Sequence, residues 1–391
     1  MSAQGAFGGS GAFGAFGGSG AFGAFGGSGA FGAFGAFGAF GAFGGPTAVD
    51  PQALIAHRDG IVGSFVGPAQ YPVQLPQESL TNFSRWEPWV RAALVDFELA
   101  SRLHFAADAG GYTLWDVEIT GLGPQPTASA HRIVQLIRPQ DDHDPSGALT
   151  RSFWRDQLEL VANWADLRAE RCNEILSQLS PPVVFWASLL GLDPQRHRFT
   201  LELVWAALRL ANHAEMRFKH ALACRRPVEL SAQLQPMIQT PGHGSLPSGH
   251  ATEAHIVAQV LWNLLKAANP AQSINWFEQL MRQAARVAIN RTIAGVHFPV
   301  DSAAGQVLGL TLAEYFVHRA SGAMQPYTSW QFTGTAYPNL LDFDWREQWQ
   351  PNSDTRRNAP SGFSVSIAGN QMSASAIFLG QLWSDALGEW Q

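Results

Sequence analysis

The feature that most constrains the fold of this chain is the helical periodicity of its central segment. From residue 152 to about residue 318, apolar side chains recur at spacings of three and four, as on the buried face of an amphipathic helix. Pro, Gly and Asn stand at the breaks between the runs, where helices end. Helices are predicted over residues 156–179, 199–224, 251–268 and 274–294. We therefore expect an all-α fold, a helical bundle.

The segments on either side carry weaker signals. Residues 1–46 repeat Gly-Ala-Phe with Gly-Gly-Ser-Gly spacers, and glycine at this density makes an ordered helix or strand costly in backbone entropy. We expect a disordered tail there, whose Phe residues are candidates for self-association, followed by one domain over 47–391 with its core at about 150–320. Residues 86–105 form the best helix before that core. The last 70 residues predict a strand-like piece at 363–367 and a final helix near 373–387.

Composition excludes several classes of protein. The formal net charge of −6 argues against nucleic-acid binding, which basic surfaces drive. The most apolar stretch, 183–192, is shorter than the roughly 18 residues that a membrane helix needs. No basic segment precedes an apolar run at the N-terminus, so no signal peptide is predicted. We expect a soluble protein of unknown compartment. Its two cysteines match no zinc spacing and form no disulfide framework.

The first segment with chemical interest is a pair of cations on one predicted helix. Lys219 and Arg226 are seven residues apart, almost two turns, so they share a face, and Pro227 ends the helix. Such a pair can clamp an oxyanion, with Arg226 supplying a planar fork of donors. Taken alone, it is more often a solvated basic face. Glu215, one turn before Lys219, is either a partner for pocket residues or an ordinary polar residue.

The second segment is Pro247-Ser248-Gly249-His250, directly before a predicted helix. Ser248 is a good N-cap, and Gly249 leaves its amide unobstructed. A helix N-terminus offers unpaired amides and partial positive charge, which suit a phosphate-like ion. His250 could donate a proton at near-neutral pH. The alternative is an ordinary capped helix with an incidental histidine.

The third segment runs from Asn290-Arg291 through Gly295 and His297 to Asp301. Gly295 can end one helix and Pro299 can open the next. Because His297 and Asp301 are four apart, a restarted helix would place them on one face, where the carboxylate fixes the tautomer of the imidazole and raises its basicity. The alternative is an ion pair at a helix end.

Together the three segments resemble the signature of the type 2 phosphatidic acid phosphatase superfamily, which includes vanadium haloperoxidases and bacterial acid phosphatases. The signature is Lys, six residues, Arg-Pro; then Pro-Ser-Gly-His; then Ser-Arg, three residues, Gly, one residue, His, three residues, Asp. The match covers 219–301, and the helical context extends it to about 150–320. The departure is Asn290, which stands where serine is usual.

The resemblance to haloperoxidases implies a role for each residue. Lys219, Arg226 and Arg291 would neutralise the oxygens of vanadate, and Ser248 and the Gly249 amide would add hydrogen bonds. His297 would bind vanadium, and His250 would act as acid–base residue. Hydrogen peroxide would give a peroxovanadate that oxidises halide to hypohalous acid for a small organic acceptor, with Lys219 polarising the peroxide. Family members are often dimers, so a homo-oligomer is possible.

The resemblance to acid phosphatases implies another use of the same residues. Phosphate would be the substrate group, His297 would form a phosphohistidine, His250 would protonate the leaving alcohol and Asp301 would hold His297 in line. Since both chemistries need preorganised positive charge around one centre, the shared residues do not separate them.

Three features favour the haloperoxidase. About 150 residues precede the helical core, the second motif is extended from residue 240, and His243 lies where haloperoxidases shape the halide side of the pocket. Fungal chloroperoxidases carry Phe there and algal bromoperoxidases His, and Met216 stands where chloroperoxidases place Trp. We therefore expect bromide or iodide. A third possibility is an assembly or scaffold protein with a vestigial pocket, but no pocket residue is lost.

Overall fold

The computed structural model describes residues 66–70, 73–108, 110–119, 127–143, 149–179, 181–322 and 326–391. The predicted tail, 1–46, lies outside these residues. The chain divides into two units, 1–94 and 95–391. In the first, helix α5 (Leu80–Arg85) begins after Ser79, whose hydroxyl accepts a hydrogen bond from the Thr81 amide at 3.3 Å. Helix α6 (Pro88–Ala100) runs across the boundary between the units. The domain boundary at 46/47 stays a prediction.

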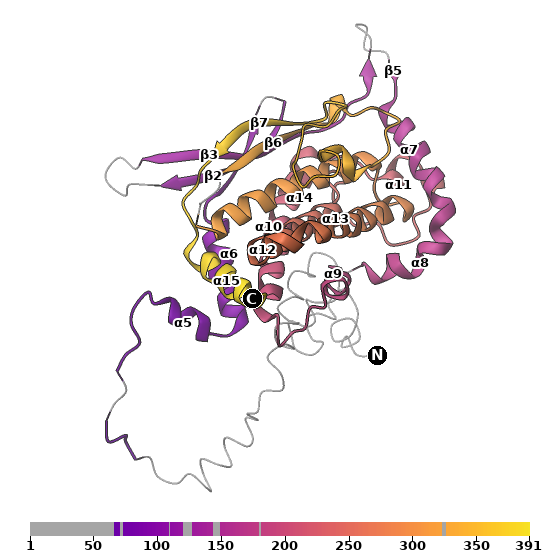
Figure 1. Cartoon of the computed structure of the whole chain (residues 1–391). Helices are drawn as coiled ribbons and strands as arrows, with labels where there is room; N and C mark the ends of the chain where they lie inside the picture. Colours follow the sequence, from indigo (N-terminus) through magenta and orange to yellow (C-terminus); the bar gives the residue numbers. More distant parts are fainter. Residues whose placement is uncertain are drawn as a thin grey trace. The chain divides into compact units, whose positions relative to one another are not determined.

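Helices dominate the second unit. Three of its four long helices, α10, α12 and α13, correspond to the predicted runs 199–224, 251–268 and 274–294. The fourth, α14, begins at Pro299, the residue expected to open a helix, and α12 packs against the other three. Figure 1 shows them grouped together. The predicted run 156–179 is two helices with a 3-10 turn (Ala165–Leu167) between them. The helices are α7 (Phe153–Trp164), α8 (Arg168–Ser177), α9 (Val183–Leu190), α10 (Arg198–Leu222), α11 (Pro227–Leu230), α12 (Gly249–Ala268), α13 (Pro270–Ile293), α14 (Pro299–Ala320) and α15 (Ile377–Gly388).

A five-stranded sheet makes the all-α prediction wrong. Its order is β1-β2-β3-β6-β7, and β3 pairs in parallel with β6 while the other neighbours are antiparallel. The sheet contacts α14 through β3 and β6, and Figure 1 shows it lying across that helix. The fold is therefore mixed α/β. The strands are β1 (Leu103–Asp108), β2 (Gly111–Ile119), β3 (Ala128–Ile137), β6 (Tyr327–Thr333) and β7 (Ser364–Gln371), and β4 (Asp142–His143) with β5 (Leu149–Arg151) forms a second, two-stranded sheet.

The predicted helix 86–105 shows how the strands were missed. Helix α6 ends at Ala100, and residues from Leu103 onward form β1 instead. Arg102 lies at the junction and donates to the buried Asp116 of β2 at 2.6 Å. Strand pairing overrides the local helical pattern here. The strand predicted at 363–367 and the helix predicted near 373–387 are confirmed by β7 and α15.

Two glycines allow α14 to approach the N-terminus of α12. A Cβ on Gly305 would lie 2.6 Å from the Ser248 carbonyl oxygen, and one on Gly309 would lie 2.4 Å from the Thr252 carbonyl oxygen. Both obstacles are backbone atoms, which cannot move aside as a side chain can. The glycines therefore set how closely the third predicted segment approaches the second.

We expect Gly305→Ala to destabilise the protein by roughly 1–3 kcal/mol through overpacking, although alanine is the better helix former by about 1 kcal/mol. Urea unfolding measures the effect. The control is Gly388→Ala at the end of α15, where the added carbon would meet no heavy atom within 4 Å beyond its chain neighbours and its own helix backbone. Equal stability of the two variants would show that the close approach does not matter.

Among the described residues, no helix combines the length and apolarity that crossing a bilayer requires.

Candidate functional site

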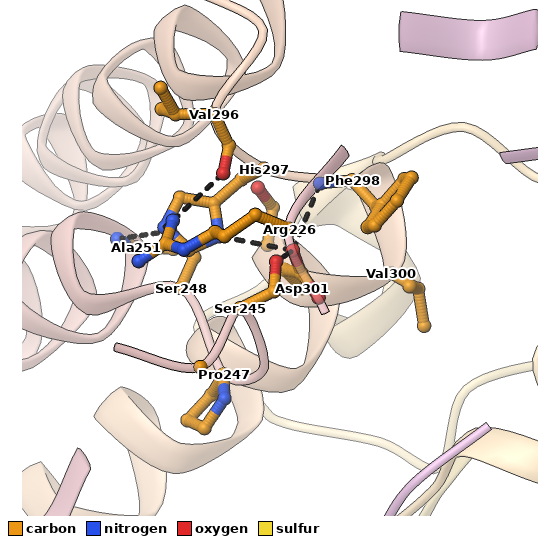
Figure 2. Close-up of polar contacts among 12 residues, drawn as sticks. Arg226, Ser245, Pro247, Ser248, Ala251, Val296, His297, Phe298, Val300 and Asp301 are labelled. Carbon is orange, nitrogen blue, oxygen red and sulfur yellow. Dashed lines mark hydrogen bonds and ion pairs between the residues drawn. The ribbon is translucent and has the colours of Figure 1, made fainter. Parts of the chain in front are cut away.

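Arg226 is the centre of the site. Its buried guanidinium donates to the Val296 carbonyl at 2.8 Å and to the His243 carbonyl at 3.0 Å. It also lies 2.8 Å from Nε2 of His297 and 3.1 Å from Nδ1 of His243. Figure 2 shows the Arg226 side chain beside the His297 ring. The first and third predicted segments therefore meet at this side chain.

Asp301 holds the other edge of the His297 ring. Its Oδ2 lies 3.0 Å from His297 Nδ1 and accepts the Phe298 amide at 2.9 Å and the Ser245 hydroxyl. All of these groups are buried, and Figure 2 shows them converging on Asp301. Helix α14 begins at Pro299, so His297 precedes the helix rather than sharing a helical face with Asp301 as the spacing predicted. The pair forms because Asp301, in the first turn, reaches back.

These contacts fix the tautomer of His297. A guanidinium only donates, so Nε2 must accept from Arg226, and the proton lies on Nδ1, where it is donated to Asp301. Burial, and then the nearby charge of Arg226, lower the pKa of His297 well below its usual value, which keeps the ring neutral. The atom directed at Arg226 therefore carries a lone pair, as a nucleophile or a metal ligand requires.

The buried Asp301 carboxyl has a raised pKa. Burial raises its pKa to about 6, against the hydrogen bonds from Ser245 and the Phe298 amide, which lower it. Ser245 was not among the predicted site residues. The one signal for it was its place two residues before Pro247 in the extended second motif.

Lys219 binds backbone carbonyls of the loop before helix α12. Its buried ammonium donates to the carbonyls of Gly244 at 3.5 Å, Ser245 at 3.4 Å and Pro247 at a shorter distance. An ammonium has three protons, so all of them have a carbonyl partner. Lys219 therefore ties the 244–247 loop to helix α10, and it places positive charge near the site without a side-chain contact to the histidines.

The second segment opens helix α12 as predicted. Ser248 is its N-cap, with a hydroxyl that accepts the Ala251 amide at 3.4 Å, and Gly249 is the first helical residue. His250 turns its Nε2 to the carbonyl of Gln178, at 2.7 Å. Burial, and then the charge of Arg291, lower the pKa of His250 to about 3. Its hydrogen bond therefore runs to the end of helix α8 and not to Arg226 or His297.

Arg291 offers the free donors of the site. Its Nη2 donates to Oε1 of Gln178 at 2.9 Å, while Nε and Nη1 are buried without a hydrogen-bond partner among the described residues. Burial lowers the pKa of Arg291 to about 10, still far above neutrality. A buried cation with unsatisfied donors is costly unless an anion completes it.

Acidic side chains border the site, among them Glu215, whose role the sequence left open. Glu215 is buried, and its Oε2 has no hydrogen-bond partner among the described residues. A Cβ on Gly249 would lie 2.6 Å from Glu215 Oε1, so the carboxyl lies against the second segment. Burial raises the pKa of Glu215 and that of the neighbouring Glu253. Protonation of one of them reduces the negative charge next to the N-terminus of helix α12.

Residues 201–324 match the model of the PAP2 superfamily. No curated protein sequence matches the chain.

Two solved structures are similar to parts of it. One is a transmembrane PAP2-type phosphatidylglycerolphosphate phosphatase from Bacillus subtilis, at 22% identity and a TM-score of 0.27, over 42% of this chain and 75% of the other. The second is a bacterial vanadium-dependent iodoperoxidase, at 17% identity and a TM-score of 0.35, over 46% of this chain. The chain spans 52% of that iodoperoxidase.

Proposed function

We propose, from the match of residues 201–324 to the PAP2 superfamily and from the buried cations around His297, that this protein is an enzyme acting through a tetrahedral oxyanion. Its favoured activity is that of a vanadate-dependent haloperoxidase that oxidises bromide or iodide with hydrogen peroxide. The observation that carries the proposal is the convergence of Arg226 and Asp301 on the two ring nitrogens of one neutral, buried histidine.

The residues present fit vanadate and phosphate alike. Both are tetrahedral anions that match guanidinium donors, and Arg291 holds two buried donors without partners. The Arg226 guanidinium adds positive charge beside His297. His297 Nε2 is the group that would bind vanadium, with Ser248 and Gly249 at the positive end of helix α12. When bound, vanadate supplies the Lewis-acid activation of hydrogen peroxide that halide oxidation needs.

The chain's own residues do the positioning. Asp301 keeps the proton of His297 on Nδ1, so that Nε2 keeps its lone pair. That lone pair accepts from Arg226 in this structure, and a bound oxyanion would take the place of this hydrogen bond. His250 is neutral next to Arg291, and a dianion bound between them would stabilise its protonated form and make it an acid. Lys219 secures the loop that carries Ser245, the partner of Asp301.

His243 supports the haloperoxidase over the phosphatase. Its ring lies within 3.1 Å of the Arg226 guanidinium, so it borders the oxyanion site rather than standing free in the loop. Burial, followed by the charge of Lys219, lowers its pKa to about 4, which leaves a neutral ring beside the cations. A neutral donor in this place suits a halide. The phosphatase remains the alternative because the lone pair of His297 Nε2 also fits an attack on phosphorus.

The discriminating experiment adds orthovanadate to protein freed of oxyanions, then hydrogen peroxide, bromide and a phenol. We expect bromination of the phenol that depends on vanadate. A parallel assay follows hydrolysis of a phosphate ester. Hydrolysis that vanadate inhibits, with no halogenation, would overturn the proposed haloperoxidase activity in favour of a phosphatase. Absence of both activities would overturn the proposal that the protein is an enzyme.

A further inference from the structure

A residue outside all three motif segments touches two of them. Gln178 caps the C-terminus of α8 and is fully buried. Its backbone carbonyl accepts from His250 at 2.7 Å, in the second segment. Its side-chain oxygen accepts from Arg291 at 2.9 Å and from Asn290 at 3.0 Å, in the third. Gln178 therefore contacts the second segment through its carbonyl and the third segment through its side chain.

The segment that carries Gln178 is itself anchored to the third segment. Ile175 packs in an apolar cluster with Ile293, Ala294 and Val296. At the start of α8, Arg168 donates to the Ile293 carbonyl at 2.9 Å. The end of α8 therefore cannot shift independently of the loop that leads to His297.

Asn290 has a matching role that explains its departure from the usual serine. Its amide nitrogen donates to Glu174 Oε1 at 2.9 Å as well as to Gln178 Oε1. Glu174 in turn accepts from Gln178 Nε2 at 3.2 Å and from Arg286 at 2.7 Å. A serine hydroxyl carries one proton and could not donate to both acceptors. Asn290 thus completes a network that orients the Gln178 amide with its oxygen toward Arg291.

We propose that Gln178 is a positioning residue of the oxyanion site, which orients Arg291 through its side chain and fixes the tautomer of His250 through its carbonyl. The inference rests on the proposed oxyanion function. The bond from Arg291 Nη2 to Gln178 holds the guanidinium so that Nε and Nη1 are left for the ligand. Because a carbonyl only accepts, His250 carries its proton on Nε2 and its lone pair on Nδ1.

The substitution Gln178→Met separates these two roles. It removes the side-chain acceptor at nearly constant volume but keeps the carbonyl that faces His250. We expect inorganic phosphate and orthovanadate to bind at least about tenfold more weakly, the effect of losing a hydrogen bond to a charged group. In the Arg291→Met background, Gln178→Met should change affinity less than twofold, because Gln178 acts through Arg291. Nitrogen NMR should still find the His250 proton on Nε2.

The matched control is Gln348→Met, another buried glutamine, whose side-chain oxygen accepts from Ser364 at 2.8 Å. It should lose stability without losing oxyanion affinity. Should Gln178→Met fail to fold, Asn290→Ser keeps the bond to Arg291 but removes the bridge to Glu174, and about threefold weaker binding is expected.

The proposal is overturned if folded Gln178→Met binds both anions with an affinity within twofold of the unmodified protein. It is also overturned if the affinity losses of Gln178→Met and Arg291→Met simply add in the double variant. Where Asn290→Ser replaces an unfolded Gln178→Met, unchanged affinity of Asn290→Ser overturns it. Any of these results leaves the proposed function standing, provided that the unmodified protein binds. Failure of the unmodified protein to bind either anion overturns the function and this inference together.

Discussion

Replacement of His297 by alanine is expected to lower turnover by at least about a thousandfold, in either the halogenation or the phosphate-ester assay, since removing the central group of a catalytic unit has effects of this size or larger. His297 Nε2 directs its lone pair at the buried guanidinium of Arg226, while Asp301 holds the other ring nitrogen. Steady-state kinetics with saturating vanadate or ester measures the loss. Asp301→Asn, which leaves the ring but weakens its orientation, should lose about 10- to 100-fold.

The control is His220→Ala, which removes an exposed histidine from the same helix as Lys219. It should keep full activity. Added imidazole should restore part of the activity of His297→Ala if the missing ring is what the reaction lacks. Appreciable turnover by His297→Ala without imidazole would refute the role assigned to His297.

Replacement of Arg226 by methionine is expected to weaken the binding of vanadate and phosphate by about a hundredfold, in line with the loss of roughly 2–5 kcal/mol when one member of a buried charge pair is removed. Arg226 is almost fully buried at 1% exposure, and burial lowers its pKa to about 10, so it remains charged at neutral pH. Equilibrium titration with either anion gives the affinity.

Arg225→Met is the closest matched control, because Arg225 is the adjacent residue and is exposed. It changes the net charge by the same amount but should change affinity less than twofold at 0.15 M salt, where surface charges are screened. Similar losses in the two variants would mean that general charge, not the geometry around His297, attracts the anion. In Arg226→Met the carbonyls of His243 and Val296 lose their hydrogen-bond donor. Unfolding curves of both variants check that this loss does not unfold the protein.

The helices could be predicted because their signal is local. The periodic runs 199–224, 251–268 and 274–294 became α10, α12 and α13, and Ser248 caps α12 as its residue type indicated. The sheet could not be predicted in the same way. Strand β3 pairs in parallel with β6, almost two hundred residues later, and no local pattern records such a partner. The alternation in β2 was a usable signal, but the Pro and Gly residues around it hid it.

Some residues of the candidate site also have a local sequence signal, and others do not. Three short motifs, joined by their resemblance to one family signature, indicated Lys219, Arg226, His250, Arg291 and His297 as candidates. They did not indicate Gln178, Ser245 or the burial of Glu215, which come to the site from helix α8, a loop and the inner face of α10. Nor did spacing show that Lys219 binds loop carbonyls, since a spacing gives a helix face and not the neighbour of that face.

The sequence by itself indicated the candidate site residues and the approximate course of helices α10, α12 and α13, because capping, periodicity and motif spacing act over a few residues. The tertiary structure alone decided the mixed α/β class, the proton positions on His297 and His250, and the partners that hold Arg291. Those properties depend on atoms from segments far apart in the chain, brought within hydrogen-bond distance by the packing of α8, α12 and α14. A hydrogen bond between distant segments has no local signature, so only the folded arrangement contains it.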